Sequence, residues 1–373
     1  MKFKIKKNIL LEGLNNVSKA LSNRNIIPVL NGILFNLTNK GLSLTATDND
    51  LTIKTFIDKS DIINIDSEGS VVIIGRYVLD IIRKLPCEEV EIEEIEGGKA
   101  IISTPNAKYN LNCFDINDFP KIDIVENDKP IKLLTGKFKE IVNQTVFSTS
   151  MQESRPLLTG INLKIIGNLL ETVATDSYRL SKKIIKLDKN VDNNINIVIP
   201  AKNVIELIKI IENEESELVL YCFNNKILFK YENILFQSSL LNGTYPNTDT
   251  LIPTEFQTKL QLNLNDFYDV VDRAALLTQV KDKNIVQLEL KDNNIIITSS
   301  SPEIGKVEEV MPIKALTGPN IKISFSAKFM MDALKSFTSE EVIIMLNGDI
   351  KPIIIKESED GDLTQLILPI KTY

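Results

Sequence analysis

A chain of 373 residues with 43% apolar and 25% charged side chains is typical of a globular protein that buries two or three hydrophobic cores. The net charge is −7 and histidine is absent, which excludes histidine-based triads, histidine general bases and most zinc sites. The acidic total also argues against a general nucleic-acid binder, although charge placed on one face matters more for binding than the sum.

The sequence contains no predicted membrane span, signal peptide or disulfide framework, and these absences predict where in the cell the protein is found. No apolar run approaches the roughly 18–20 residues of a membrane span, and polar residues from Glu12 onward interrupt the segment that follows the basic start. An odd number of widely spaced cysteines argues against the disulfide framework of a secreted protein. These are Cys87, Cys113 and Cys222. We expect a cytoplasmic protein, without a membrane partner and without a cofactor or metal.

The predicted elements recur in one order along the chain: a helix, strands, a second helix and more strands. The first helices span Asn8 to Ser22, Gly136 to Thr149 and Asn265 to Thr278. The alternating strands that follow them include 31–37, 159–165 and 285–290, and strands at 89–95, 218–223 and 342–346 follow the second helices. Short strands joined by Asn-Gly, Asn-Asn and Gly-Gly turns favour antiparallel hairpins.

The second helix of each copy carries the clearest repeat. The predicted helices are 75–83, 201–209 and 327–335, and their apolar residues recur at i, i+3, i+4 and i+7. Two cations in each helix lie seven residues apart and roughly opposite the apolar stripe. Equivalent cations in successive copies are spaced by 126 residues: Arg76, Lys202 and Lys328, and then Arg83, Lys209 and Lys335. The sequence therefore predicts a basic helix face that is repeated three times.

A repeat of this length indicates domain duplication rather than a short-repeat solenoid. We predict an α+β fold of three repeated domains, each an antiparallel sheet with helices on one face. Charged or proline-containing joints place the domain limits at 1–127, 128–253 and 254–373.

Several motifs, in their order and spacing, resemble one known family. They are the opening Met1-Lys2-Phe3, the segment from Ser22-Asn23-Arg24 to Leu30, Val173-Ala174-Thr175-Asp176 with Arg179-Leu180, Ile199-Pro200-Ala201-Lys202, and the ending Leu368-Pro369-Ile370-Lys371. Over essentially the whole chain, this arrangement resembles the bacterial DNA polymerase III beta subunit, the sliding clamp family.

The resemblance implies a non-catalytic processivity factor of DNA replication. It implies a head-to-tail homodimer that closes into a ring around duplex DNA without reading its sequence, a clamp loader that opens the ring, and a polymerase alpha-type subunit and other clamp-motif proteins as partners. The ring lining needs only enough charge to centre the phosphate backbone. The predicted DNA contacts are Arg24, Arg76, Arg83, Lys202, Lys209, Lys328 and Lys335. The plain alternative for each is a solvated surface cation.

The resemblance also implies an apolar pocket for partner peptides at the junction of the second and third domains. The matching positions are Leu158, Thr175, Ser177, Tyr178, Arg179, Leu180, Pro246, Leu251, Leu366, Ile367, Leu368, Pro369, Ile370 and Lys371. Apolar walls, a proline and Arg179 at the rim suit a peptide with leucine or phenylalanine anchors. The alternative for Leu180, Leu251 and Ile367 is that they belong to the core.

Three departures from the family pattern fall in or beside this set. Ser177-Tyr178 stands where the family commonly has glycine or serine followed by histidine, Leu368-Pro369-Ile370-Lys371 replaces an ending that is often Met-Pro-Met-Arg, and Thr250 stands at the position of a common arginine. We therefore expect the pocket to be kept and its peptide preference to differ.

Two other functions stay open. Asp48 and Asp176, each in an Ala-Thr-Asp context, could form a carboxylate dyad like that of aspartic proteases. That family needs a glycine two residues after the aspartate, and here Asp50 and Tyr178 occupy those positions; the simpler interpretation is a turn closed by hydrogen bonds to the backbone. The second alternative is a scaffold that never encircles DNA. Nucleotide-binding loops are not expected.

Overall fold

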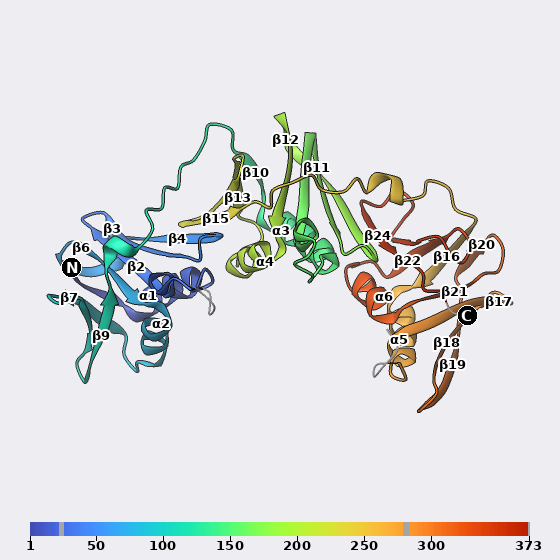
Figure 1. Ribbon diagram of the computed structural model, residues 1–373, viewed down its shortest axis with the longest axis horizontal. Helices are drawn as coiled ribbons and strands as arrows, with labels where there is room; N and C mark the ends of the chain where they lie inside the picture. The colour runs from blue at the N-terminus through green and yellow to red at the C-terminus, as the bar shows by residue number, and fades with distance from the viewer. Residues whose placement is uncertain (22–25, 279–283, 372–373) are drawn as a thin grey trace. The chain divides into compact units, whose positions relative to one another are not determined.

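The computed structural model describes residues 1–21, 26–278 and 284–371, and the chain divides into two units. Unit 1 comprises Met1–Phe138 and Asn203–Leu240, and unit 2 comprises Lys139–Lys202 and Leu241–Tyr373 (Figure 1).

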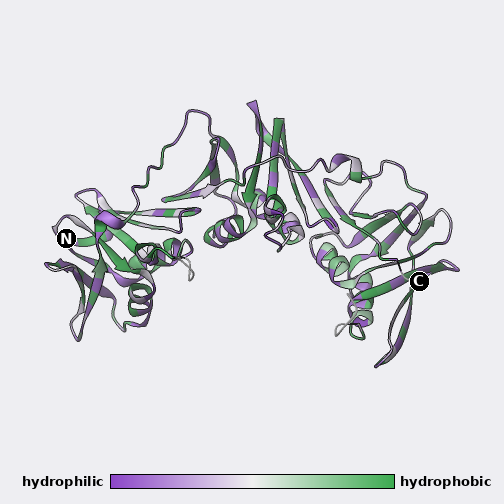
Figure 2. Ribbon diagram, viewed as in Figure 1, coloured by the Kyte–Doolittle hydropathy of each residue, from purple (hydrophilic) through white to green (hydrophobic). Residues whose placement is uncertain are grey.

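The helices form where the sequence predicts them. In the described residues they are α1 (Lys7–Ser18), α2 (Gly75–Lys84), α3 (Thr135–Thr145), α4 (Ala201–Ile210), α5 (Leu264–Ala275) and α6 (Ala327–Leu334). Two of the starts have side-chain caps: Asn263 accepts from the Asp266 amide at 3.0 Å, and Ser326 accepts from the Phe329 amide at 3.4 Å. Figure 2 shows hydrophobic and hydrophilic residues alternating around the helices, as amphipathic helices require.

Unit 1 is built on one sheet in which every pair of neighbours is antiparallel. Its order is β10-β13-β14-β15-β4-β3-β2-β6-β9-β8-β7-β1-β5. The strands are β1 (Lys2–Lys6), β2 (Gly32–Thr38), β3 (Gly41–Thr47), β4 (Leu51–Asp58), β5 (Ile62–Ser67), β6 (Gly69–Ile74), β7 (Glu89–Ile95), β8 (Lys99–Thr104), β9 (Ala107–Phe114), β10 (Ile131–Leu134), β13 (Glu217–Cys222), β14 (Lys226–Tyr231) and β15 (Ile234–Ser239). Pairing of β15 with β4 joins strands of the second copy to the first.

Helix α1 packs closely on this sheet. Its Leu10, Leu14 and Val17 are fully buried, and it lies against β3 and β4. A Cβ added at Gly13 would stand 3.0 Å from the Leu44 side chain, so glycine permits the close approach of the helix. Farther along the sheet, Phe229 packs edge-on against Phe236 with 6.1 Å between the ring centroids.

Unit 2 contains two antiparallel sheets, ordered β11-β12-β24-β23-β22-β16-β20 and β19-β18-β17-β21. The strands are β11 (Gly160–Thr175), β12 (Arg179–Pro200), β16 (Thr258–Asn263), β17 (Ile285–Lys291), β18 (Asn294–Ser301), β19 (Gly305–Pro312), β20 (Ala315–Thr317), β21 (Lys322–Ser326), β22 (Glu341–Leu346), β23 (Ile353–Lys356) and β24 (Leu363–Ile367). Helices α5 and α6 pack side by side over a core that includes Phe267, Phe325 and Leu334 (Figure 1).

A buried polar network crosses the β12 and β24 pair in unit 2. Ser181 bonds both the Ser148 hydroxyl, at 2.6 Å, and the Gln365 side chain. The Gln365 amide nitrogen donates to the Gln144 carbonyl and the Ser336 hydroxyl, each at 2.9 Å. Because a buried polar group without a partner is costly, this network favours one relative position of the elements that it joins.

The antiparallel α+β prediction is therefore confirmed. Its limits at 127/128 and 253/254 stay a prediction, since the two units divide the second copy: β15 pairs with β4, whereas β12 pairs with β24. No helix in the described ranges is long and apolar enough to cross a membrane.

Candidate nucleic-acid and peptide interfaces

The predicted basic residues of the second helices are exposed. Arg24 lies outside the described residues. The other six predicted cations have exposed side chains, two on α2, two on α4, one on α6 and one at its C-cap: Arg76 and Arg83, Lys202 and Lys209, and Lys328 and Lys335. The apolar stripes of these helices are buried at Val78, Leu207 and Met330. In all three copies, therefore, the helix buries apolar residues on one side and exposes the two cations on the other, as predicted.

Several of these cations have partners at the surface. Arg83 lies 3.4 Å from Asp80 and Lys209 lies 2.7 Å from Glu206, each within its own helix. Lys335 lies over the Tyr268 ring at 5.3 Å, and a hydrogen bond to Tyr268 raises the pKa of Lys335. Exposed pairs of this kind contribute about 0–1 kcal/mol, so a phosphate can replace the carboxylates at little cost.

The sequence analysis missed one cation in unit 1. Lys19 follows α1 and lies near Glu206 and Lys209 of α4; its burial lowers its pKa, Glu206 opposes that effect and Lys209 adds to it. Glu212 also acts on Lys19, so the charges around this lysine are of both signs. The only sequence signal was the position of Lys19 in the last part of the predicted first helix.

An apolar cluster lies in unit 2 where the peptide pocket was predicted. Leu158, Leu180 and Leu366 are buried in this cluster, together with Tyr245, which precedes Pro246. Strand pairing sets Leu180 opposite Leu366. Four further buried members were not predicted: Val173, Val198, Met345 and Ile354. A period-two pattern shows that such residues face one side of a sheet, but it does not tell which cluster they join.

The remaining predicted pocket residues differ in exposure. Thr175 is buried; Pro369 and Ile370 are half-buried; Ser177, Tyr178, Pro246, Leu251, Leu368 and Lys371 are exposed. Tyr178 is 63% exposed and Leu251 50% exposed; Leu251 precedes Ile252, which packs against the cluster. Ile367 belongs to the separate core beneath α5 and α6, and Leu180 is 1% exposed. Ile367 and Leu180 are thus buried and Leu251 is exposed, and the assignment of these three residues to the peptide pocket stays a prediction.

The predicted segment 175–180 forms a tight turn between β11 and β12. The Asp176 Oδ1 accepts from the amides of Tyr178 and Arg179, both at 2.9 Å. The Thr175 hydroxyl donates to the Arg179 carbonyl at 2.6 Å. Ser177 has φ 78°, in the left-handed region that favours glycine.

The first copy contains the same turn between β3 and β4. The Asp48 Oδ1 accepts from the amides of Asp50 at 3.0 Å and Leu51 at 2.7 Å, and Asn49 has φ 76°. The Thr47 hydroxyl donates to the Leu51 carbonyl at 3.0 Å. Each aspartate thus closes its own turn, as the backbone interpretation predicts.

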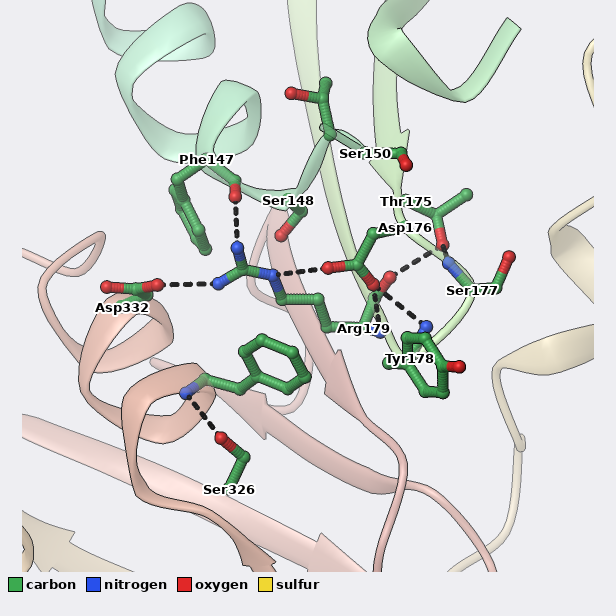
Figure 3. A network of polar contacts seen from close by, with 12 residues as sticks. Phe147, Ser148, Ser150, Thr175, Asp176, Ser177, Tyr178, Arg179, Ser326 and Asp332 are labelled. Atoms are coloured by element: carbon green, nitrogen blue, oxygen red, sulfur yellow. Dashed lines mark hydrogen bonds and ion pairs between the residues drawn. The ribbon is translucent and has the colours of Figure 1, made fainter. Parts of the chain in front are cut away.

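Arg179 is the best-connected side chain of the predicted pocket, and it is only 9% exposed. Its guanidinium lies 3.0 Å from Asp176 and 2.7 Å from Asp332 of α6, and it donates to the Phe147 carbonyl at 2.5 Å (Figure 3). The Phe329 and Phe147 rings lie 4.5 and 5.4 Å from it. The sequence analysis expected a cation at the rim; the structure instead buries it between the 175–180 turn and α6.

Comparison with known proteins agrees with this fold. Three family descriptions match successive parts of the chain: DNA polymerase III beta subunit, N-terminal domain, over residues 1–123; central domain over 132–247; and C-terminal domain over 249–371. The chain belongs to the DNA polymerase III beta subunit family.

Relatives support the assignment over the full length of the family. The "Beta sliding clamp" of Bacillus subtilis is 39% identical over 378 residues, and that of Staphylococcus aureus is 38% identical over 377, with all of each chain covered. The solved sliding clamp of Bacillus subtilis superimposes with a TM-score of 0.97 at 39% identity. The beta chain from Streptococcus pneumoniae gives 0.96 at 34% identity, again with both chains covered completely.

Family membership decides between the sequence-based alternatives. The beta subunit is a processivity factor and not a catalytic subunit. The carboxylate-dyad alternative for Asp48 and Asp176 is therefore wrong, in agreement with the part that each plays in its own turn. The sliding clamp assignment is likewise favoured over a scaffold. In the part of the chain that the structure describes, no group of acidic or cysteine side chains could hold a metal ion.

Proposed function

We propose that this chain acts as a DNA sliding clamp: it encircles duplex DNA as a head-to-tail homodimer and tethers the replicative polymerase and other replication and repair proteins. The observation that carries the proposal is the exposure of cations at one phase on the second helix of every copy, at Arg76, Lys202 and Lys328. Sequence-independent attraction to phosphates requires this type of contact.

The electrostatics of these helices suit a mobile contact with DNA. Arg76 and Lys328 make no ion pair with any residue that the structure describes, and the partners of Arg83 and Lys209 are exposed carboxylates that bind weakly. Each phosphate contact of this kind releases counterions and gives a salt-dependent attraction. Retention then depends on ring closure, while the contacts centre the duplex without holding it in place.

The peptide pocket is the second part of the proposal. The apolar cluster around Leu158, Leu180 and Leu366 suits leucine or phenylalanine anchors of a partner peptide. The exposed side chains of Tyr178 and Leu251, which are near this cluster in sequence, offer further apolar contact. The polymerase alpha-type subunit and a clamp loader that opens the ring are the expected users of this pocket. We place the protein in the cytoplasm, with domains at 1–127, 128–253 and 254–373.

The decisive experiment loads the protein on a nicked circular plasmid with its cognate loader and ATP, and then cuts the plasmid once. Loss of the protein after the cut is expected, because only the closed circle retains a ring. Retention on linear DNA would overturn the proposal.

The helix contacts need a charge-matched comparison. The variant Lys202→Ala with Lys328→Ala should show weaker retention and a shallower salt dependence, because the log–log slope falls by about 0.9 for each phosphate that the variant no longer neutralises. Lys259→Ala with Lys306→Ala removes the same charge from strands β16 and β19 and should behave like the wild type. Equal behaviour of both variants would exclude the helix contacts.

The pocket is tested by anisotropy with a labelled peptide that carries the clamp motif of the cognate polymerase. Leu251→Ala should weaken peptide binding several-fold, whereas Ile350→Ala, which removes a comparably exposed apolar side chain elsewhere in unit 2, should not. A chain that ends at Ile367 should lose polymerase stimulation. Full stimulation by that shortened chain would remove the pocket assignment.

A further inference from the structure

A cavity of about 460 Å³ in unit 1 has no part in the function proposed above. Its floor is the sheet face formed by β2, β3, β4 and β15, and its wall is the segment 116–124 that follows β9. The wall is held in place where the Lys226 Nζ donates to the Asp123 carbonyl at 3.3 Å. Lys54 projects from β4 into this cavity and is half-buried.

The internal repeat shows how the residue equivalent to Lys54 is bound in the second copy. Lys54 follows Asp48 of the first turn by six residues, as Lys182 follows Asp176 of the second. The strand registers also agree, since Lys54 is paired with Thr45 and Lys182 with Val173, and each partner precedes the aspartate of its turn by three residues. The two lysines are equivalent positions of two copies of one domain.

In the second copy the lysine is neutralised by its own chain. Lys182 lies 2.7 Å from Glu171 and 2.9 Å from Asp249. Although burial alone would lower it, the pKa of Lys182 is raised by these two carboxylates. The position is therefore built to hold a lysine with carboxylate oxygens against its ammonium group.

In the first copy the principal carboxylate is missing. The position equivalent to Glu171 is Ser43, and the position equivalent to Asp249 is Asp123. Both residues line the cavity, yet Lys54 makes no ion pair with any residue that the structure describes. Replacing a glutamate by a serine removes a charge and opens space beside the lysine in the same step.

The remaining lining fits a carboxylate attached to an apolar segment. Ser43, Thr45 and Asn36 supply hydroxyl and amide groups near Lys54, and Lys121 adds a second positive charge against the single carboxylate of Asp123. The other lining residues include apolar side chains: Leu34, Phe119, Ile122 and Leu235. A fully hydrated phosphate or a DNA backbone would gain no binding free energy from these apolar walls. An apolar peptide side chain next to a glutamate or aspartate would, because the walls remove it from water.

We propose that this cavity is a second partner-binding site, which takes an acidic residue flanked by apolar residues from another protein and pairs its carboxylate with Lys54. The partner's carboxylate stands where Glu171 stands in the second copy. The site is separate from the peptide pocket of unit 2 and does not depend on that pocket.

The test uses two pools of labelled pentapeptides, one with a central glutamate and one with a central glutamine, each flanked by leucine, isoleucine or phenylalanine. Anisotropy with the full-length protein should detect the glutamate pool and show at least tenfold weaker binding of the glutamine pool. Lys54→Gln should weaken the glutamate pool about tenfold. A chain that ends at Ile367 should bind that pool as the wild type does, which separates this site from the pocket of unit 2.

Ser43→Glu is the sharpest variant, since it restores to the first copy the carboxylate that Glu171 provides in the second. It should abolish binding of the glutamate pool and leave the protein at least as stable as the wild type in thermal unfolding, so that misfolding cannot explain the loss. The proposal would be overturned if the glutamate pool did not bind to the wild type. It would also be overturned if Lys54→Gln and Ser43→Glu bound that pool as tightly as the wild type does. Displacement of the pool by 10 mM phosphate or by a short DNA duplex would also overturn it, in favour of a simple anion site.

Discussion

Replacing Arg179 by alanine should destabilise unit 2 more than any single ion pair at its surface. The change removes ion pairs to Asp176 and Asp332, a hydrogen bond to the Phe147 carbonyl and the packing against the Phe329 ring. Breaking a buried pair costs about 3–5 kcal/mol, but Asp332 is partly exposed and regains water, which favours the lower end of that range. We expect a loss of about 3 kcal/mol, or roughly 6–12 °C in Tm for a unit of about 200 residues.

Differential scanning calorimetry resolves this effect against a matched control. Lys259→Ala breaks an exposed pair with Glu359 in the same unit and should change Tm by about 2 °C or less. A double-mutant cycle of Arg179→Ala and Asp332→Ala should give a coupling energy of at least about 1 kcal/mol, because the two side chains touch. Equal Tm shifts for Arg179→Ala and Lys259→Ala, or additive effects in the cycle, would show that Arg179 does not fasten the turn to α6.

Two other predictions concern the backbone and the cysteines. Gly318→Ala should lower the free energy of unfolding in urea by at least about 1 kcal/mol more than Gly97→Ala does. Both glycines have positive φ, but a Cβ at Gly318 would stand 1.9 Å from the Gln257 carbonyl oxygen, whereas nothing lies within 4 Å of a Cβ at Gly97. Equal losses of stability would contradict this steric argument. Burial raises the pKa of the Cys113 and Cys222 thiols to about 11. At pH 8 their thiolate fractions are therefore about a hundredfold below those of ordinary thiols. Replacing both cysteines by serine should leave the fast phase of Ellman's reaction unchanged.

The helices and hairpins could be predicted from the sequence because their signals are local. A period of 3.6 residues fixed the phase of α2, α4 and α6, and with it the exposure of the cations. Helix ends were less accurate: α1 begins at Lys7 although Lys6 provides no side-chain cap, so no capping signal marked its start. The pairing of β15 with β4 was also missed, because an alternating pattern shows that a strand has two faces but not which strand lies beside it.

The site was predicted less completely because its contacts are distant in sequence. Arg179 was predicted to lie at the pocket rim, but it is buried against Asp332, which is 153 residues away. On α4 the apolar Ile208 is only half-buried, whereas the polar Asn203 is buried and its amide donates to Ser238 at 2.8 Å. A polar residue on the buried side of a helix needs a partner, and a single sequence does not name that partner.

The repeat itself supplies information that a single domain would not. The turns at Asp48 and Asp176 have the same hydrogen bonds, so the differences between copies are changes of side chain on a common backbone. In the second copy Glu171 forms an ion pair with Lys182. The first copy has Ser43 at the position of Glu171, and a cavity lies beside Lys54. Loss of a half-buried ion-pair partner costs stability unless another group takes its place. A bound carboxylate would restore that missing interaction, so the stability of unit 1 should itself rise when the cavity is occupied.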